Sequence, residues 1–254
     1  MLVLDRKLLL FRVKEIHFAD KPFDVSGCDR LCFCYCKGRF DVQGFTCTPG
    51  LTLVINLTED LDVLWKKLKP QCRQQINRAQ RQDIKITINK YYEEFYHIFR
   101  LFQSQKRGYG LPFGIGLPSL DTLKRCGTLF TAESQGEIIG GHLFLQGQTT
   151  FKSYLSASKR LGTEKERYHL IGNANRLMYW ESIKYAKGQG LQEFDWGGMW
   201  SDEEANADVS RQNINQFKRS FGGEMVQFYN YEKIYSRIYR IGYSLLERVA
   251  GTKP

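Results

Sequence analysis

Short runs of alternating apolar and polar residues mark the first 57 residues of the chain. Residues 8–18 are largely apolar, and residues 31–35 and 40–46 have strand-like patterns. The run LTLVINL at residues 51–57 is the clearest strand, because single polar residues interrupt an apolar series. We therefore expect an abbreviated β-rich N-terminal lobe over residues 1–57.

A positively charged helix is predicted after this lobe, over residues 58–83. Thr58 is its expected N-cap, and Pro70 is expected to break or restart it, because proline lacks the N–H that a helix interior needs. After its acidic first turn the segment carries six basic residues. Among them, Arg78 and Arg81 are expected to contact phosphate groups, and a solvated charged face is the alternative.

From residue 84 onwards the periodicity alternates between that of strands and that of helices, which predicts a third segment over residues 84–254. The expected order is β-α-α-β-β-β-α-β-α-β followed by a final helix, which indicates an α/β protein with a mixed (α+β) sheet. The expected strands are 84–88, 128–133, 138–146, 149–157, 191–196 and 224–231. The expected helices are 91–105, 120–125, 168–187, 213–221 and 232–249.

Composition narrows the class of protein and its partners. The 254 residues carry a net charge of +10, which favours an anionic partner such as a nucleic acid, a nucleotide or a membrane surface. Seven cysteines without a secretory leader fit a reducing compartment. No apolar run reaches the roughly 20 residues that cross a bilayer. We therefore expect a cytoplasmic protein.

Two segments near the C-terminal end carry the best candidate chemistry. The strand at 191–196 ends in Asp195-Trp196-Gly197-Gly198, and a basic helix containing Phe217 and Lys218 follows. An acid and two glycines at a strand end, facing a basic helix, leave a polar opening at a sheet edge where a substrate could bind. This pairing predicts an enzyme.

Three segments, in this order, resemble the FemAB-like branch of the Gcn5-related N-acetyltransferase (GNAT) superfamily. They are Leu64-Trp65-Lys66-Lys67-Leu68 through Arg81, the helix Trp180–Lys187 with the strand end at Asp195, and Phe217-Lys218-Arg219-Ser220-Phe221-Gly222-Gly223. The resemblance covers about residues 55 to 235. It implies a GNAT-like acyltransferase fold behind the abbreviated lobe. FemAB-like enzymes usually contain two full lobes and some carry a helical arm, and this chain departs from both patterns.

The resemblance also implies a reaction. An aminoacyl group would pass from aminoacyl-tRNA to an amine of a cell-envelope or amino-sugar precursor, as in peptidoglycan and cell-wall biogenesis. Acyl-coenzyme A is the alternative donor in the same chemistry, although the loop from Lys159 to Gly162 lacks the compact pyrophosphate pattern of acetyltransferases. A non-catalytic module that binds nucleic acid or an envelope precursor is the alternative class. The oligomeric state and the acyl group stay open.

Several residues receive roles. The resemblance implies that Lys218 offsets oxyanion or phosphate charge and that Phe217 contacts the donor or acceptor. Asp195 either accepts a proton and orients the amine, or caps the turn that follows it. Gly197 allows the turn and close backbone approach, beside Trp196 as a further substrate-binding residue.

Two more positions are candidates. Glu181 falls within the apolar stripe of the helix 168–187, so its carboxylate should be paired or help in proton transfer. Tyr154 lies on a strand whose alternation would place it on one face with Lys152 and Ser156. We expect Tyr154 to line the substrate site, with an ordinary strand tyrosine as the alternative.

Amide formation needs neither a metal nor a covalent intermediate, and the sequence agrees with this. It contains no G-x-S-x-G motif, and its four histidines lack ligand spacing. Alternation places Cys32, Cys34 and Cys36 on one face with sulfurs about 7 Å apart, too wide for one zinc ion. We expect no metal and no tightly bound cofactor.

The final helix suggests a further contact. Its apolar stripe is Ile234, Ile238, Ile241, Leu245 and Val249. Packing against the sheet or a second subunit is the default. Docking at the inner membrane surface, which would suit a lipid-linked acceptor, is the alternative.

Overall fold

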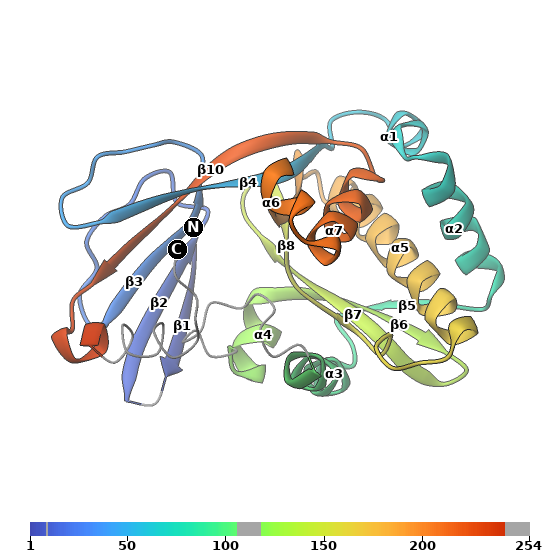
Figure 1. Cartoon of the computed structure of the whole chain (residues 1–254), viewed down its shortest axis with the longest axis horizontal. Helices are drawn as coiled ribbons and strands as arrows, with labels where there is room; N and C mark the ends of the chain where they lie inside the picture. The colour runs from blue at the N-terminus through green and yellow to red at the C-terminus, as the bar shows by residue number, and fades with distance from the viewer. Residues whose placement is uncertain (9, 106–117, 242–254) are drawn as a thin grey trace. The chain divides into compact units, whose positions relative to one another are not determined.

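The computed structural model describes residues 1–8, 10–105 and 118–241 (Figure 1). The chain forms two compact units. The first consists of Met1–Gly50, Gly108–Thr122 and Gln227–Pro254, and the second of Leu51–Arg107 and Leu123–Val226. The division therefore differs from the continuous segments 1–57, 58–83 and 84–254, because two strands run from one unit into the other.

The first unit is built on strands β1 (Leu2–Leu8), β2 (Phe11–His17), β3 (Arg30–Cys36) and the end of β10 (Glu224–Ile234). These strands lie in the order β1-β2-β3-β10. Strands β2 and β3 are parallel, and the other pairs are antiparallel. The apolar run at residues 8–18 contains β2, whereas β1 was not predicted.

Two boundaries predicted near β4 (Thr46–Asn56) are wrong. No strand covers residues 40–45, because the chain turns there: Gly44 has φ +79° and Phe45 N donates to Val42 O at 3.1 Å. Thr58 does not cap a helix, since its N–H and hydroxyl both donate to Asn56 Oδ1, at 3.0 and 2.8 Å. The helix begins only at Leu61, after Asp60.

The second unit contains a mixed sheet in the order β4-β9-β8-β7-β6-β5. Among the described strands of this sheet only β8 and β9 are parallel, and this pair lies between antiparallel neighbours. The strand bounds are β5 Lys85–Ile88, β6 Gly127–Ser134, β7 Glu137–Gln146, β8 Thr150–Ser158 and β9 Glu193–Met199. The predicted α/β mixed-sheet fold is confirmed.

The helices follow the predicted order, with one addition, α6. Their bounds are α1 Leu61–Lys67, α2 Pro70–Arg81, α3 Tyr92–Gln105, α4 Leu120–Cys126, α5 Lys165–Gly188, α6 Asp202–Asn206 and α7 Val209–Arg219. Pro70 is the first residue of α2, so it restarts the helix as expected. It fits there because its ring fixes φ and its missing N–H is not needed in the first turn.

Helices α3 and α5 cover opposite faces of the sheet in the second unit (Figure 1). Strand β7 shows why, because its residues alternate between the two helices. Gly141 lies against Phe95 of α3, whereas the His142 and Phe144 rings pack on Tyr179 of α5. Helix α2 packs on the outer side of α5. The core under α5 is rich in aromatic rings, which include Phe130, Phe144, Phe151, Phe194 and Trp196.

The predicted final helix is displaced. Strand β10 continues to Ile234, and helical residues begin at 237. The longer strand is held because Tyr231 packs in the apolar cluster of the first unit and Glu232 pairs with Arg30 at 2.9 Å. The predicted stripe positions Leu245 and Val249 lie outside the described residues. No described helix combines the length and hydropathy that a membrane crossing requires.

Candidate active site

Strands β8 and β9 separate near the middle of the sheet in the second unit. Their parallel pairing runs from Thr150↔Glu193 to Lys152↔Asp195. Beyond that point each strand bulges against its other neighbour. On β8, Tyr154 is the extra residue between the pairs formed by Ser153 and Leu155. Bulges twist and bend a strand, so the two strands diverge immediately after Asp195.

The bulge on β9 corrects the predicted turn at Asp195-Trp196-Gly197-Gly198. Strand β9 does not end at Asp195 but continues to Met199. Opposite it, β4 pairs through Thr52↔Gly198 and Val54↔Asp195, which leaves Trp196 and Gly197 facing one residue. Gly197 has φ +70°, a conformation that favours glycine. The two glycines are therefore used to bend a continuing strand.

Asp195 is fixed at the start of this bulge. Its Oδ1 accepts the backbone N–H of Gly197 at 2.8 Å and the hydroxyl of Thr52. The same hydroxyl lies 2.9 Å from Gly197 O. Asp195 and Thr52 are both buried, at 7% and 3% exposure. The cap-like bond to the second following residue, one of the two expected arrangements, is present.

Lys218 joins the basic helix α7 to the bulge. Its Nζ donates to Gly198 O at 2.6 Å and lies 3.5 Å from Gly197 O. The predicted proximity of the basic helix and the glycines is thus confirmed. Burial lowers the pKa of Lys218 to about 8, because desolvation penalises the ammonium form, and the charge of Asp195 opposes this shift. An ammonium has three donors, so one stays available to a substrate oxygen.

Phe217 lies beside Lys218 and is half-buried. Its ring centroid is 5.7 Å from that of Tyr179, and the guanidinium carbon of Arg176 lies 4.8 Å from the Phe217 centroid. Arg176 is in turn held by Gly172 O at 3.2 Å. Sequence reasoning missed Arg176, although a lone arginine among the apolar residues of α5 was a signal.

Trp196 occupies a different place from the one predicted. It is 1% exposed, and its ring packs 4.3 Å from Tyr179 and 4.8 Å from Phe221. A side chain so enclosed belongs to the core and is not exposed for contact with a substrate. The cause is the β9 bulge, which directs the indole into the core under α5.

Tyr154 is half-buried on the β8 bulge, where the strands diverge. The predicted common face for Lys152, Tyr154 and Ser156 is wrong, because an extra residue breaks the alternation of a strand. Lys152 is 2% exposed, whereas Ser156 is exposed. The expected role of Tyr154 in lining a substrate site stays a prediction.

Glu181 is paired, as one of its two expected roles required. Its Oε1 lies 2.8 Å from Lys184 Nζ, one turn further along α5. Within the described part of the chain, no hydrogen bond or ion pair connects Glu181 with Asp195 or Lys218. The structure therefore does not bring Glu181 into the group formed by the other candidates.

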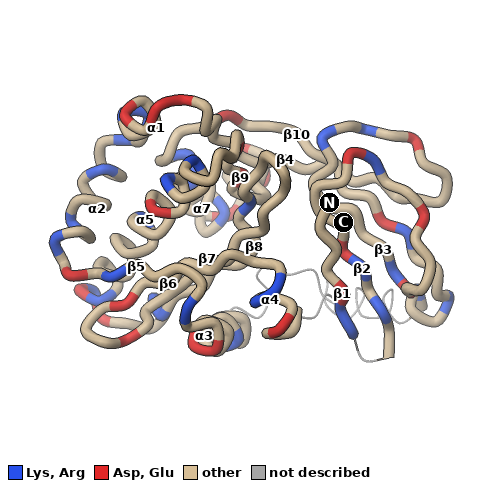
Figure 2. Tube along the Cα trace, turned by 180° about the vertical axis from the view of Figure 1, so that it is seen from behind, with Lys and Arg blue, Asp and Glu red and all other residues tan. Residues whose placement is uncertain are grey.

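The positively charged segment predicted at residues 58–83, which forms α1 and α2, has basic residues that serve the structure. Arg73 donates to Lys66 O at 3.1 Å and to Leu68 O, and so closes the end of α1. Lys67 pairs with Glu59 at 2.5 Å. Arg78 and Arg81 remain exposed on α2, where Figure 2 shows Lys and Arg along the helix. They form a basic surface and not part of the bulge site.

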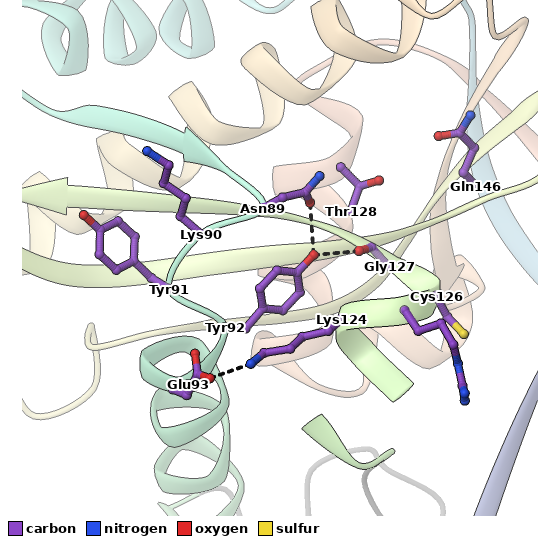
Figure 3. A pocket seen from close by; sticks show the side chains of 11 residues that line it. Asn89, Lys90, Tyr91, Tyr92, Glu93, Lys124, Cys126, Gly127, Thr128 and Gln146 are labelled. Carbon is purple, nitrogen blue, oxygen red and sulfur yellow. Dashed lines mark hydrogen bonds and ion pairs between the residues drawn. The ribbon is translucent and has the colours of Figure 1, made fainter. Parts of the chain in front are cut away.

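Two hollows in the second unit lie elsewhere. One, of about 700 Å³, is drawn in Figure 3. The Tyr92 hydroxyl there lies 3.0 Å from Asn89 Oδ1 and 2.9 Å from Gly127 O, and Lys124 pairs with Glu93 at 2.5 Å. The other hollow, of about 610 Å³, is lined by His97, Glu137 and Lys159 among others. Neither hollow is lined by Asp195 or Lys218.

A family model described as "Acetyltransferase (GNAT) domain" matches residues 66–219. No curated protein matches the chain. Among solved structures, the chain is similar to FemX, at 12% identity over 95% of this chain and 86% of that chain, with a TM-score of 0.62.

The chain is also similar to two further solved structures. One is the C-terminal domain (DUF2156) of a putative lysylphosphatidylglycerol synthetase from Agrobacterium fabrum, at 11% identity, 87% and 71% coverage and a TM-score of 0.56. The other is L-PGS from Bacillus licheniformis, at 15% identity, 88% and 73% coverage and a TM-score of 0.55. With identities this low, these TM-scores show a common fold and nothing more.

Proposed function

Because the chain belongs to the acetyltransferase (GNAT) domain family, whose chemistry is acyl transfer, we propose that it forms an amide by transferring an aminoacyl group from aminoacyl-tRNA to an amine. The acceptor we propose is a nucleotide- or lipid-linked cell-envelope precursor or an amino sugar. The similarity in fold to FemX and to lysylphosphatidylglycerol synthetases supports the aminoacyl form of the reaction.

The observation that carries the proposal is the position of Lys218 against the β9 bulge. Its Nζ is anchored by Gly198 O at 2.6 Å, at the point where β8 and β9 part. In the proposed reaction the amine attacks the ester carbonyl of the donor, and the carbonyl oxygen becomes negative. The remaining N–H of the ammonium stabilises that oxygen, which is the largest contribution a site of this kind can make.

Asp195 takes the proton in this scheme. As the C–N bond forms, the amine nitrogen must lose a proton, and as the C–O bond breaks, the ribose oxygen of the tRNA must gain one. Within the described residues, the hydrogen bonds from Gly197 and Thr52 both fall on Oδ1 of Asp195, and we assign Oδ2 to the substrate amine. A carboxylate held this rigidly positions the nucleophile as well as its proton.

Phe217 and Tyr154 complete the proposed walls. Phe217 contacts Tyr179 edge to face and Arg176 through the guanidinium, and it stays half-buried beside Lys218. Tyr154 lies on the opposite bulge. An aromatic wall suits the terminal adenosine of a tRNA, whose base can stack on a ring. Arg78 and Arg81 would then contact phosphates further along the donor.

Acyl-coenzyme A is the second candidate donor, and one local feature favours it. Gly162 has φ +71°, and α5 begins three residues later at Lys165, so free backbone N–H groups follow a sharp bend. In the same loop, the guanidinium of Arg160 stacks on Tyr168 at 3.7 Å. Such a bend suits a pyrophosphate.

Melting temperature in the presence of each donor separates the two candidates. Charged tRNA at concentrations well above its dissociation constant should raise the melting temperature, because a ligand that binds only the folded state stabilises it. Uncharged tRNA and acetyl-coenzyme A are the matched controls. A shift with acetyl-coenzyme A alone would transfer the assignment to the second donor, and binding without turnover would indicate the non-catalytic module.

A further inference from the structure

One face of the sheet in the first unit carries buried polar side chains beside the buried apolar residues Leu4 and Val13. Glu15 and His17 are two residues apart on β2, so their side chains share a face. Cys34 is the partner of His17 on the parallel neighbour β3. Glu15 and His17 are 8% and 1% exposed, and Cys34 is half-buried.

The three side chains converge on a small volume. His17 Nε2 lies 3.0 Å from Glu15 Oε1, and Cys34 Sγ lies 3.6 Å from the same oxygen. The three ligand atoms all lie within 4.8 Å of one another. Zinc bonds of about 2.0–2.3 Å in tetrahedral geometry require separations between ligand atoms of about 3.3–3.6 Å. Small side-chain shifts would bring the three atoms to that spacing.

We propose that Glu15, His17 and Cys34 bind one Zn²⁺ ion. The thiol of Cys34 loses its proton to solvent, the carboxylate of Glu15 and the neutral imidazole of His17 donate lone pairs, and water occupies the fourth position. The two anionic ligands offset the two charges of the ion. The cluster lies in the first unit, so the proposal does not depend on the acyltransferase site.

Arg6 orients one of the ligands. It forms an ion pair with Glu15 through Oε2, whereas His17 and Cys34 face Oε1. A carboxylate held through one oxygen presents the other in a fixed direction. Metal ligands are commonly fixed in this way by a partner outside the coordination sphere.

The backbone of β3 explains why Cys36, on the same strand, lies away from the group formed by Glu15, His17 and Cys34. Tyr35 has φ +62°, which interrupts the alternation of the strand. Cys36 consequently packs in the apolar cluster with Phe33 and Tyr231, so the predicted common face for Cys32, Cys34 and Cys36 is wrong. Cys32 is the partner of Glu15 but does not belong to the convergent group.

An ion-pair network without a metal is the competing account, because Arg6, Glu15 and His17 could stabilise one another by themselves. Equilibrium dialysis of the metal-stripped full-length protein against Zn²⁺ distinguishes the two. We expect one ion per chain, and Co²⁺ in its place should give the intense visible absorption of a tetrahedral site. Absence of stoichiometric binding would leave only the ion-pair network.

Variants locate the ion. Cys34→Ala and His17→Ala should each weaken binding by at least about 100-fold, because even partners outside the coordination sphere contribute 10–100-fold. Cys47→Ser, at a half-buried cysteine of the same unit that is not in the group, should leave binding unchanged. Unchanged binding in both ligand variants would overturn the proposal.

A measurement on the unaltered protein covers the case in which a variant fails to fold. Zn²⁺ should slow alkylation of Cys34 at least tenfold, as mapped on peptides, and leave the rate at Cys47 unchanged. Equal rates at Cys34 with and without the ion would contradict coordination by its sulfur.

Discussion

Lys218 Nζ donates to the carbonyl oxygen of Gly198 at 2.6 Å, and this bond fixes a helix against a bulged strand. Gly198 lies at one end of the β9 bulge, which falls between the pairs Thr52↔Gly198 and Val54↔Asp195. A lysine held by backbone oxygens beside a carboxylate can act on a substrate without first reorganising. This arrangement is the basis of the predictions that follow.

Replacement of Lys218 by alanine should reduce kcat/KM for acyl transfer at least tenfold. Loss of one donor to a developing oxyanion typically costs about 3–4 kcal/mol of transition-state stabilisation, so the loss could reach several hundredfold. Arg219→Ala is the matched control, because Arg219 is the next residue and pairs with Asp202 at 2.7 Å. Steady-state rates, with circular dichroism to verify folding, check this. An unchanged rate would remove Lys218 from the mechanism.

Activity should decline as the pH rises through about 8, because burial lowers the pKa of Lys218 to about 8 and the ammonium is the active form. The sign for stability is opposite. The unfolded chain binds more protons than the folded one between pH 8 and the ordinary lysine pKa, so the free energy of unfolding attributable to Lys218 rises there. In Lys218→Arg the alkaline decline in kcat/KM should move to higher pH. A profile identical to that of the original protein would assign the decline to another group.

Thr52→Val should destabilise the protein by about 1–3 kcal/mol, because it removes a buried hydroxyl that bonds both Asp195 and Gly197. It should also lower kcat more than it raises KM, since Asp195 loses its fixed position. Thr150→Val, which removes a bond to Glu193 elsewhere in the same sheet, is the control for stability. Urea unfolding and steady-state kinetics supply the two readouts. Equal kinetic effects in both variants would show that Thr52 has no special role.

The double change Arg78→Gln and Arg81→Gln should weaken tRNA binding and flatten its salt dependence. Each phosphate contact contributes about 0.7–0.9 to the slope of log K against log salt, so two lost contacts reduce the slope by about 1.4–1.8. Arg100→Gln with Arg125→Gln, two exposed arginines on α3 and α4, is the charge-matched control. Filter binding at several salt concentrations gives the slopes. Equal slopes for the two double variants would show that Arg78 and Arg81 contribute only to the overall positive charge and do not contact phosphates specifically.

The order of elements could be predicted because the evidence for it is local. Apolar spacing within α3, α5 and the strands β5 to β8 is a property of each segment, and it gave the mixed sheet and the sequence of helices. The proximity of Lys218 to the two glycines could also be predicted, since α7 begins only ten residues after the end of β9 at Met199, with the short helix α6 between them. Pro70 correctly predicted the break between α1 and α2.

The details of the site depended on pairing between distant segments. The β9 bulge exists only because Thr52 and Val54 of β4 align with Gly198 and Asp195, more than 140 residues away. The sequence of β9 alone therefore read as a turn. Because this pairing between distant strands cannot be read from one segment, the role of Thr52 and the buried position of Trp196 were also not predicted.

The prediction that Cys32, Cys34 and Cys36 share one face of their strand was wrong for a related reason. Alternation assumed an undistorted strand, and the positive φ of Tyr35 broke it. The contacts that matter to Cys34 come from Glu15 on the neighbouring strand, at a sequence separation of 19. Spacing within one segment carries no information about such a neighbour.

The most direct measurement is mass-spectrometric detection of the amide product. The protein is incubated with aminoacyl-tRNA and a panel of amine acceptors that includes a nucleotide-linked envelope precursor, an amino sugar and an aminophospholipid. The account predicts an acceptor whose mass increases by one aminoacyl residue, in an amount that falls at least tenfold with Lys218→Ala. Transfer of an acyl group from coenzyme A alone, or formation of the amide at an equal rate without Lys218, would contradict it.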